Sequence, residues 1–427
     1  MMRGTSCGLW SHRGAARGGV ALLLLSLVGS ACRGQERPAT EFAAEVDSLL
    51  PRLERLSGLE AREPVRVEWQ DSAGVRAYIQ RQLDDELPPE DLAGMHATYA
   101  AFGLIPDSLD LRRLLLDLYT EQVAGYYDPD TETLYLVEGA APQELGVVLA
   151  HELVHALQDQ HANLDSLIAR ERGNDRQTAA QAAIEGQATL VMVALAMEER
   201  IGVEVAAAQL PDIGAQLEPM LETQNAQFPV FRSAPRIIRE TLLFPYARGA
   251  AFVQALWRAA EAEGETRRPA PLGPLLPQST EQVIRPRERF IGERDAPTEL
   301  RLAEPAADWR AVYENTLGEL ETGILLEEHL GAGADSLAIG WDGDRYRLLE
   351  APDGGSALVW YTVWDSDAAA DAFAEAYQRI LEARPDRRGR VERIEIEGRP
   401  GVRVIDAERG VPLDRVPVPA VTGVVEG

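Results

Sequence analysis

The sequence predicts an α+β fold: a mainly helical domain with a small β-sheet, followed by a small C-terminal α+β domain. Two observations lead to this prediction. Apolar residues recur at helical spacing through much of residues 41–266, whereas short β-prone runs and one long helical pattern follow after about residue 320. With 427 residues, 45% hydrophobic and 26% charged, the chain is large enough for roughly two or three globular domains.

Residues 1–32 have the composition of a secretory signal. Three arginines and no acidic residue precede an apolar run over residues 20–28, which is too short to span a bilayer comfortably, so a transmembrane helix is the weaker interpretation. The small residues that follow resemble a bacterial lipoprotein processing site, at which Cys32 is lipidated and becomes the new N-terminus. Gly29 departs from that pattern, and ordinary signal cleavage after Ala31 is the alternative.

The composition excludes several classes of chemistry and partner. After loss of the signal Cys32 is the only cysteine, which excludes an internal disulfide, a cysteine-ligated zinc site and a cysteine protease. All 42 basic residues are arginine, which excludes Schiff-base chemistry and a phosphate-loop lysine. The net charge of −27 argues against nucleic acid or anionic membrane surfaces as partners. We therefore expect an exported cell-envelope protein that meets the membrane only through an N-terminal lipid anchor; its oligomeric state is not predicted.

The elements of the helical domain (41–266) follow a polar linker (33–40) and are read from periodicity and turn residues. Two β-prone runs around Asp128-Pro129-Asp130 predict a hairpin, and Pro142 suits the first turn of a helix whose apolar positions continue to Leu157. The expected helices are 41–57, 71–83, 106–121, one that starts near Pro142, 178–200 and 234–263, and the hairpin is 125–137.

The last third of the chain is expected to form a separate unit. Proline-rich residues begin a linker and extended segment over 267–319, and an α+β accessory domain occupies 320–427. Asp342-Gly343-Asp344 lacks the length and ligand number of an EF-hand loop and is interpreted as a tight turn without a metal. The expected elements are a short helix after 320, strands near 345–350 and 357–364, a helix at 367–384, and strands near 390–396 and 401–406.

The string His151-Glu152-Leu153-Val154-His155 carries the functional prediction. Residues four apart on a helix share one face about 6 Å apart, so both imidazoles can reach one metal ion at about 2.0–2.1 Å. Glu152 lies beside that face, where it can accept a proton from water whose pKa zinc lowers to about 7. The alternative is an ordinary amphipathic helix that happens to carry two histidines.

Catalytic zinc usually has three protein ligands, so the motif needs a third, and two residues compete. His161 has the spacing that metzincins use in HExxHxxGxxH, but Gln158 replaces the glycine that turns the chain. In a continuing helix His161 would lie about 280° round from His151 and point away from the metal. Glu185 interrupts an apolar, alanine-rich run, where burying a carboxylate is costly unless a metal or cation satisfies it, and it is the better candidate.

The pair of histidines followed by Glu185-Gly186-Gln187-Ala188 resembles the gluzincin type of zincin metallopeptidase, whose glutamate ligand comes from a following helix. The resemblance covers mainly residues 122–195. It implies a zincin-like domain that binds Zn²⁺ through His151, His155 and Glu185. In that family a hairpin before the metal helix supplies the strand that pairs with an extended peptide; here a hairpin that only covers the core is an equal alternative.

The resemblance also implies an oxyanion donor, because gluzincins commonly use a Tyr or His from a later helix. Tyr246 is the first candidate for this catalytic role, with a packed core tyrosine as its alternative, and Tyr126 and Tyr127 are further candidates. Thermolysin-like enzymes carry an aspartate four residues after the glutamate ligand to orient a histidine. Here that position is Thr189, so the support of that histidine is in question.

The sequence therefore predicts zinc-dependent hydrolysis of peptide bonds in a peptide or protein substrate, with Glu152 as general base. One alternative is a noncatalytic zinc-binding protein of the cell envelope, and another is hydrolysis of a different amide or an ester. A purely structural zinc site has no use for a carboxylate beside its ligands, which favours the enzyme. Ser279–Gln282 and Trp341–Arg345 are similar to strings in uncharacterised bacterial secreted proteins and indicate no substrate.

Overall fold

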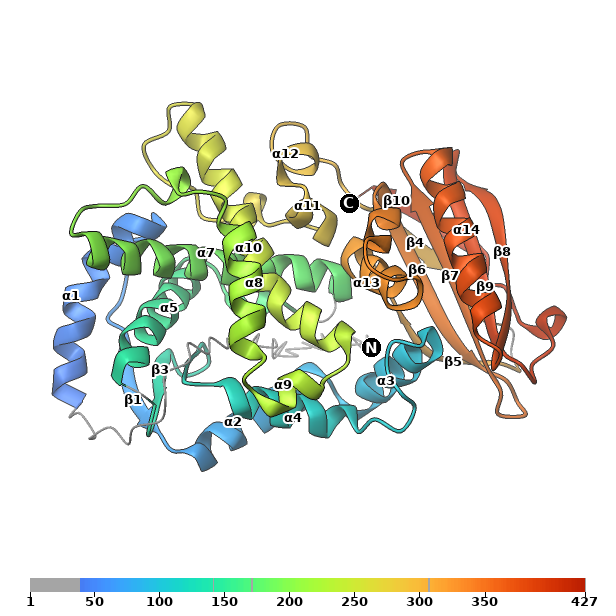
Figure 1. The fold of residues 1–427 in the computed structure, drawn as a ribbon, viewed down its shortest axis with the longest axis horizontal. Helices are drawn as coiled ribbons and strands as arrows, with labels where there is room; N and C mark the ends of the chain where they lie inside the picture. Colours follow the sequence, from blue (N-terminus) through green and yellow to red (C-terminus); the bar gives the residue numbers. More distant parts are fainter. Residues whose placement is uncertain (1–38, 141, 170–171, 306–307, 427) are drawn as a thin grey trace, which may run out of the picture.

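The computed structural model describes residues 39–140, 142–169, 172–305 and 308–426 (Figure 1). The predicted signal and Cys32 lie outside the described residues, so lipidation stays a prediction. Within them the predicted α+β class is confirmed, with a helical body at one end of the molecule and a five-stranded sheet at the other.

The helical body contains all the helices predicted for it. It adds four that were not predicted: α3 and α8, and the short helices α6 and α9. Its main helices are α1 (Ala39–Ser57), α2 (Ser72–Glu86), α3 (Pro89–Phe102), α4 (Leu111–Gln122), α5 (Pro142–His161), α7 (Asn174–Ile201), α8 (Ile213–Asn225) and α10 (Arg236–Ala262), with the short helices α6 (Leu164–Leu167) and α9 (Pro229–Ser233).

A three-stranded sheet, in the order β1-β3-β2, lies against α5. The predicted hairpin is confirmed as β2 (Gly125–Asp128) paired antiparallel with β3 (Thr133–Val137). β1 (Arg66–Gln70) pairs parallel with β3 and was not predicted, because its five residues are too few to show an alternating pattern clearly. β2 is thus one of the two edge strands of the sheet that the described strands form, and it lies against α5.

Helix α7 is the centre of the helical body. Among the described residues it is the one helix that is long and apolar enough to cross a membrane by length and composition. In the fold, however, 78% of its most apolar 18-residue stretch is buried, as expected for a helix in a protein core. Its alanine-rich faces pack on α1, α5 and α10 and give the backbones close access to one another.

α7 and α10 cross most closely where two glycines face each other. A Cβ on Gly186 would lie 2.0 Å from the carbonyl carbon of Gly249, and a Cβ on Gly249 would lie 2.0 Å from the carbonyl oxygen of Ala182. Real side chains do not fit at such distances, so only glycine allows this approach. The contact sets α10 directly beside Glu185, the neighbour of Gly186.

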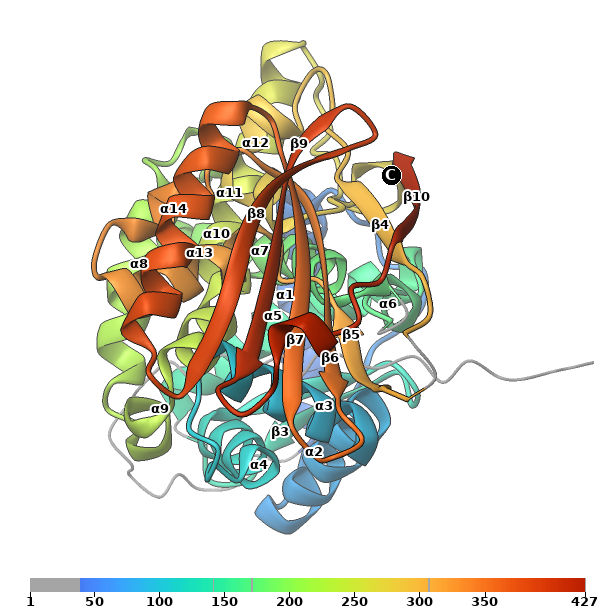
Figure 2. The ribbon, with the colours of Figure 1, turned by 90° about the vertical axis from the view of Figure 1, so that its right-hand side faces the viewer.

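The C-terminal sheet has the order β5-β6-β7-β9-β8, with every neighbouring pair antiparallel (Figure 2). Trp360 and Tyr346 face an apolar cluster shared with α3 and α14, whereas Val359 and Tyr361 face a second cluster under β4. The elements are β4 (Thr298–Leu302), β5 (Arg310–Asn315), α13 (Gly318–Leu330), β6 (Trp341–Glu350), β7 (Ser356–Trp364), α14 (Asp367–Ala383), β8 (Arg387–Ile396), β9 (Arg399–Glu408) and β10 (Val421–Glu426).

Two predictions for this region differ from the structure. The segment 267–319, predicted as a proline-rich linker and extended segment, contains the helices α11 (Thr280–Ile284) and α12 (Pro286–Arg289) as well as β4 and β5; β5 pairs with β6, and β4 with β10. The string Asp342-Gly343-Asp344 is not a tight turn but the bulged start of β6, where a Cβ on Gly343 would lie 2.1 Å from the Thr298 carbonyl oxygen. The conformation of both segments depends on pairing with strands that lie elsewhere in the sequence.

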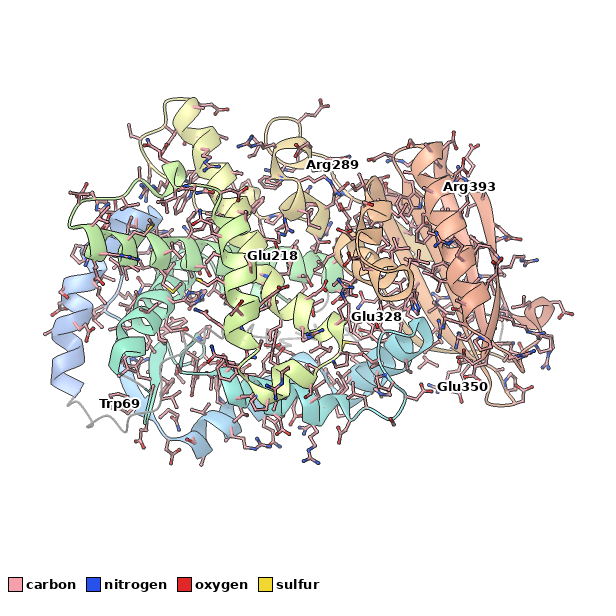
Figure 3. All side chains as sticks on the ribbon, in the orientation of Figure 1. Trp69, Glu218, Arg289, Glu328, Glu350 and Arg393 are labelled. Carbon is pink, nitrogen blue, oxygen red and sulfur yellow. The ribbon has the colours of Figure 1, made fainter. Side chains whose placement is uncertain are left out.

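Polar contacts, some at the surface and some buried, join this segment to the rest of the molecule. Arg289, labelled in Figure 3, forms ion pairs with Glu281 of α11 and with Asp365, which follows β7. Asp175, at the start of α7, accepts hydrogen bonds from the backbone N–H and the hydroxyl of Thr280, 3.1 Å and 2.5 Å away. The string Ser279–Gln282 therefore works as a structural joint between α7 and the C-terminal domain.

Adding a methyl group at Gly186 should disrupt the helix crossing. Because the new Cβ meets the backbone of Gly249 rather than a movable side chain, we expect Gly186→Ala to lower the free energy of unfolding by about 1–3 kcal/mol. Gly146→Ala in α5 is the matched control: the nearest atom to its Cβ is a carboxylate oxygen of Glu45 at 3.5 Å, so stability should stay the same or rise by up to about 1 kcal/mol. Urea denaturation measures the free energy of unfolding of both variants. Equal values would contradict the close contact of α7 and α10 at Gly186.

Candidate metal centre

Helix α5 presents His151 and His155 on one face, one turn apart. Leu149, Leu153 and Leu157 anchor the opposite side of the helix in the core, which fixes its rotation. The two imidazole rings lie with their centroids 4.7 Å apart at an interplanar angle of 72°. The predicted i, i+4 pair is therefore present, and both rings are fully buried.

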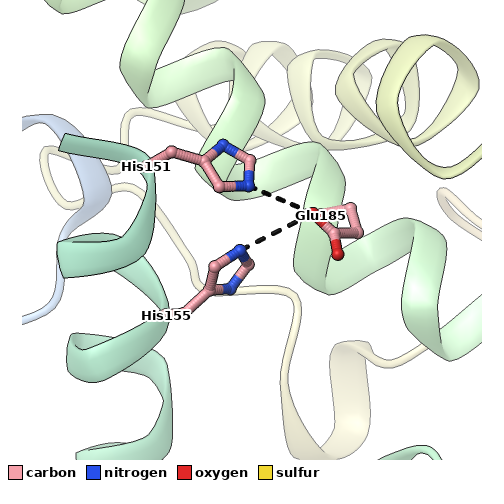
Figure 4. A group of neighbouring side chains, drawn as sticks. All are labelled: His151, His155 and Glu185. Atoms are coloured by element: carbon pink, nitrogen blue, oxygen red, sulfur yellow. Dashed lines mark hydrogen bonds and ion pairs between the residues drawn. The ribbon is translucent and has the colours of Figure 1, made fainter. Parts of the chain in front are cut away.

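Glu185 of α7 reaches between the two rings (Figure 4). Its Oε2 atom lies 3.2 Å from Nε2 of His151 and 3.6 Å from Nε2 of His155. The ligand atoms of all three side chains lie within 4.8 Å of one another. In a tetrahedral zinc site with bonds of about 2.0–2.1 Å, ligand atoms are separated by about 3.3–3.4 Å, so the two observed distances match such a set.

Several buried polar atoms at this place lack a hydrogen-bond partner among the described residues. They include Nε2 of His155, Oε1 of Glu185 and Oε1 of Glu152. Leaving a buried polar group unpaired costs about 1–3 kcal/mol, and more for a charged group. Nε2 of His155 and Oε1 of Glu185 belong to one group of close ligand atoms, and a divalent cation would satisfy both, so the residues present fit a metal ion.

The charges of the ligands also suit a metal. Burial lowers the pKa of His151, an effect that the contact with Glu185 opposes only in part. Burial by itself raises the pKa of Glu185, but its contacts with His151 and His155 lower that pKa further, to below its ordinary value. A neutral imidazole and an ionised carboxylate are the forms in which these side chains bind zinc.

Glu152 is held by the edge strand of the small sheet. Its Oε2 accepts a hydrogen bond of 2.9 Å from the backbone N–H of Tyr127 in β2, and its Oε1 has no partner among the described residues. Burial raises its pKa well above the usual range, and the nearby Glu185 adds to that, whereas the Tyr127 hydrogen bond lowers it. The hairpin therefore positions this carboxylate, a role the sequence did not suggest; whether β2 also pairs with a peptide stays a prediction.

The two candidates for the third ligand lie in different places. His161, at the end of α5, is partly exposed, and its Nε2 is 2.8 Å from the carbonyl oxygen of Glu60. Glu185 lies between His151 and His155. The helix continues through Gln158 without the turn that metzincins have, which carries His161 away as the helical geometry predicts.

The three candidate tyrosines also lie in different places. Tyr246 of α10 is buried with its ring centroid 6.3 Å from that of His151. The hydroxyl of Tyr127 donates to Oδ2 of Asp159, two helical turns beyond Glu152, and Tyr126 stacks between Tyr78 and Tyr135. Of the three, Tyr246 is the one that lies beside a proposed ligand, because the glycine crossing draws α10 against α7.

The side chains behind the two histidines differ. Nδ1 of His151 and Oγ1 of Thr189 both lack a hydrogen-bond partner within the described part of the chain, in keeping with the missing aspartate at position 189. Nδ1 of His155 lies 2.8 Å from Oε1 of Gln158. Sequence reasoning considered Gln158 only as the residue that replaces a glycine, although its spacing of three from His155 on a helix signals such a contact.

Comparisons with known proteins match only the C-terminal part of the chain. Residues 305–413 match a family described as a domain of unknown function, DUF8575. No curated protein and no solved structure matches the chain. The match lies outside the helical body that carries the metal centre, so the function must be argued from the site itself.

Neutralising Glu185 should remove the metal. Glu185→Gln keeps the shape of the side chain but loses the charge that balances a divalent cation, so we expect stoichiometric zinc binding to be lost after dialysis. His161→Ala is the matched control and should keep its zinc. Metal analysis of both proteins decides between the ligands: zinc retained by Glu185→Gln and lost from His161→Ala would reverse the assignment.

Proposed function

We propose that this protein is a zinc-dependent hydrolase of peptide bonds, exported to the cell envelope and anchored there by a lipid on Cys32. The observation that carries the proposal is the buried group of His151, His155 and Glu185 with Glu152 held beside it. A structural zinc site is closed by four protein ligands, whereas three ligands next to a carboxylate leave a position for chemistry.

The contacts of Glu152 support its role as general base. Zinc, when bound, supplies a Lewis acid and makes water acidic enough to lose a proton near neutral pH. The free Oε1 of Glu152 takes the proton from the attacking water while Oε2 stays on the Tyr127 N–H. The same carboxyl then gives the proton to the leaving amine, so it ends each cycle as it began.

The closeness of the Tyr246 ring to His151 supports Tyr246 as the oxyanion donor. Attack on a carbonyl builds negative charge on its oxygen, and a fixed hydroxyl in a buried site stabilises that charge without reorganisation. The ring of Tyr246 is held by α10 against His151, so its orientation depends on the tight α7–α10 contact rather than on a loop. We assign it this role in preference to Tyr126 and Tyr127.

The general base can be tested by replacing Glu152 with Gln, which keeps the acceptor for Tyr127 N–H but not the basic oxygen. We expect a mixed peptide library to be cleaved by the zinc-loaded protein that starts at Arg33, and cleavage to fall by about 10²–10⁴-fold in Glu152→Gln at unchanged zinc content. Loss of cleavage on chelation and its return with zinc complete the test. A folded, zinc-bound protein that cleaves no peptide would favour the noncatalytic zinc-binding protein or a non-peptide substrate.

The oxyanion donor can be tested with Tyr246→Phe, which keeps the packed ring and removes only the hydroxyl. If the hydroxyl stabilises the transition state, kcat should fall by about 10²–10³-fold with little change in KM. Tyr127→Phe, whose hydroxyl is bound to Asp159, is the matched control and should keep nearly full turnover. Unchanged kcat in Tyr246→Phe would leave this tyrosine as a packing residue.

A further inference from the structure

Two buried glutamines form a hydrogen-bonded chain behind His155. Oε1 of Gln158 lies 2.8 Å from Nδ1 of His155. Nε2 of Gln158 donates to the carbonyl oxygen of Ile184 and to Oε1 of Gln187, both at 2.9 Å. Nε2 of Gln187 in turn donates to the carbonyl oxygen of Ser57 at 3.0 Å. His155, Gln158, Gln187 and Ser57 are all fully buried.

The direction of these hydrogen bonds is set by backbone carbonyl groups, which only accept. Ser57 O requires the amide nitrogen of Gln187 on its side, so Oε1 of Gln187 must face Gln158. Ile184 O and that Oε1 both require the amide nitrogen of Gln158. Turning either amide over would place oxygen against oxygen in a buried place, at a cost of about 1–3 kcal/mol for each unpaired group.

One consequence reaches the metal centre. With its nitrogen directed at Ile184 and Gln187, Gln158 can offer His155 only an oxygen, so Nδ1 of His155 must carry the hydrogen. The neutral ring then has its lone pair on Nε2, the atom that lies 3.6 Å from Glu185 and has no hydrogen-bond partner among the described residues. A hydrogen on Nε2 would instead have to be lost before a metal could bind there.

We propose that Gln158 and Gln187 are positioning residues that fix His155 in the tautomer and orientation needed for metal binding. This inference rests on the metal site in the proposed function, but it concerns the state of the ring before any metal arrives. Gln158 follows His155 by one turn on α5, and Gln187 follows Glu185 by two residues on α7. These hydrogen bonds therefore also link α5 and α7, the two helices that supply the ligands, and connect both to the end of α1 at Ser57.

The ring next to it provides an internal contrast. His151 has no such partner behind its ring: its Nε2 lies 3.2 Å from Oε2 of Glu185, but its Nδ1 lacks a hydrogen-bond partner in the described part of the chain, and Thr189 does not reach it. We therefore expect the tautomer of His155 to be fixed before any metal binds, whereas no side chain behind His151 selects the tautomer of that ring.

The tautomer can be measured directly in metal-free protein with ¹⁵N-labelled histidine. At a pH of about 8, where an ordinary imidazole is neutral, we expect the Nδ1–H form of His155 in the wild type and its replacement by a mixture or by Nε2–H in Gln158→Leu. The His155 signals are assigned by their loss in His155→Ala. Gln187→Leu should give a smaller change, since Ile184 still orients Gln158.

Zinc affinity gives the second measurement, by competition with a chromophoric chelator. Loss of such a supporting residue typically weakens metal binding about 10–100-fold, which we expect for Gln158→Leu. Gln254→Leu is the matched control, because Gln254 is a buried glutamine of α10 that binds the carbonyl groups of Ala207 and Leu210 away from the ligands. It should lose comparable stability but keep its zinc affinity and the His155 tautomer.

The outcomes separate this inference from the proposed function. An Nε2–H form of His155 in the wild type, or a zinc affinity of Gln158→Leu equal to that of Gln254→Leu, would overturn the inference even if peptides are cleaved. The expected tautomer with a selective loss in Gln158→Leu would support it even if no peptide is cleaved, in which case only the proposed function fails.

Discussion

The rest of the structure depends on one constraint: a carboxylate buried without any exposure in the middle of an apolar helix. Glu185 costs free energy there unless positive or polar partners surround it. The two histidines of α5 supply such partners only if α5 and α7 approach within side-chain reach, and the small residues of α7 allow that approach. The same small residues, with Gly249 opposite Gly186, also let α10 pack closely against α7.

This packing gives each polar side chain of the centre a separate support. Glu152 is held by the edge of the small sheet through Tyr127, and His155 is held by the glutamines behind it. His151 lies against the ring of Tyr246. Because these supports come from four elements far apart in the sequence, the site exists only in the folded helical body, and rigid helices rather than loops carry it.

The C-terminal domain is built into the same fold rather than appended to it. Phe102 of α3 packs edge-on against Tyr346 and Trp360 of the sheet, within one continuous apolar cluster. Asp344 accepts hydrogen bonds from the indole groups of Trp341 and Trp360 and from the backbone at the start of α13. The string around Trp341 is thereby explained as a structural joint, and removing this domain would expose part of the helical body's own core.

The sequence by itself determined the α+β class, the long helices, the hairpin before α5 and the approach of two histidines on one helical face, because these follow from local periodicity and from the fixed pitch of a helix. It also favoured Glu185 over His161, from the cost of an acid in an apolar run and from helical rotation. It missed the helices α3 and α8, and it missed the strands β1, β4, β5 and β10, whose pairing partners lie far away along the chain. It also took the start of β6 for a turn. Only the tertiary structure decided which tyrosine lies beside the ligands, that Tyr127 holds Glu152 and that Gln187 of α7 orients Gln158, since those contacts depend on how helices and strands pack rather than on any local pattern.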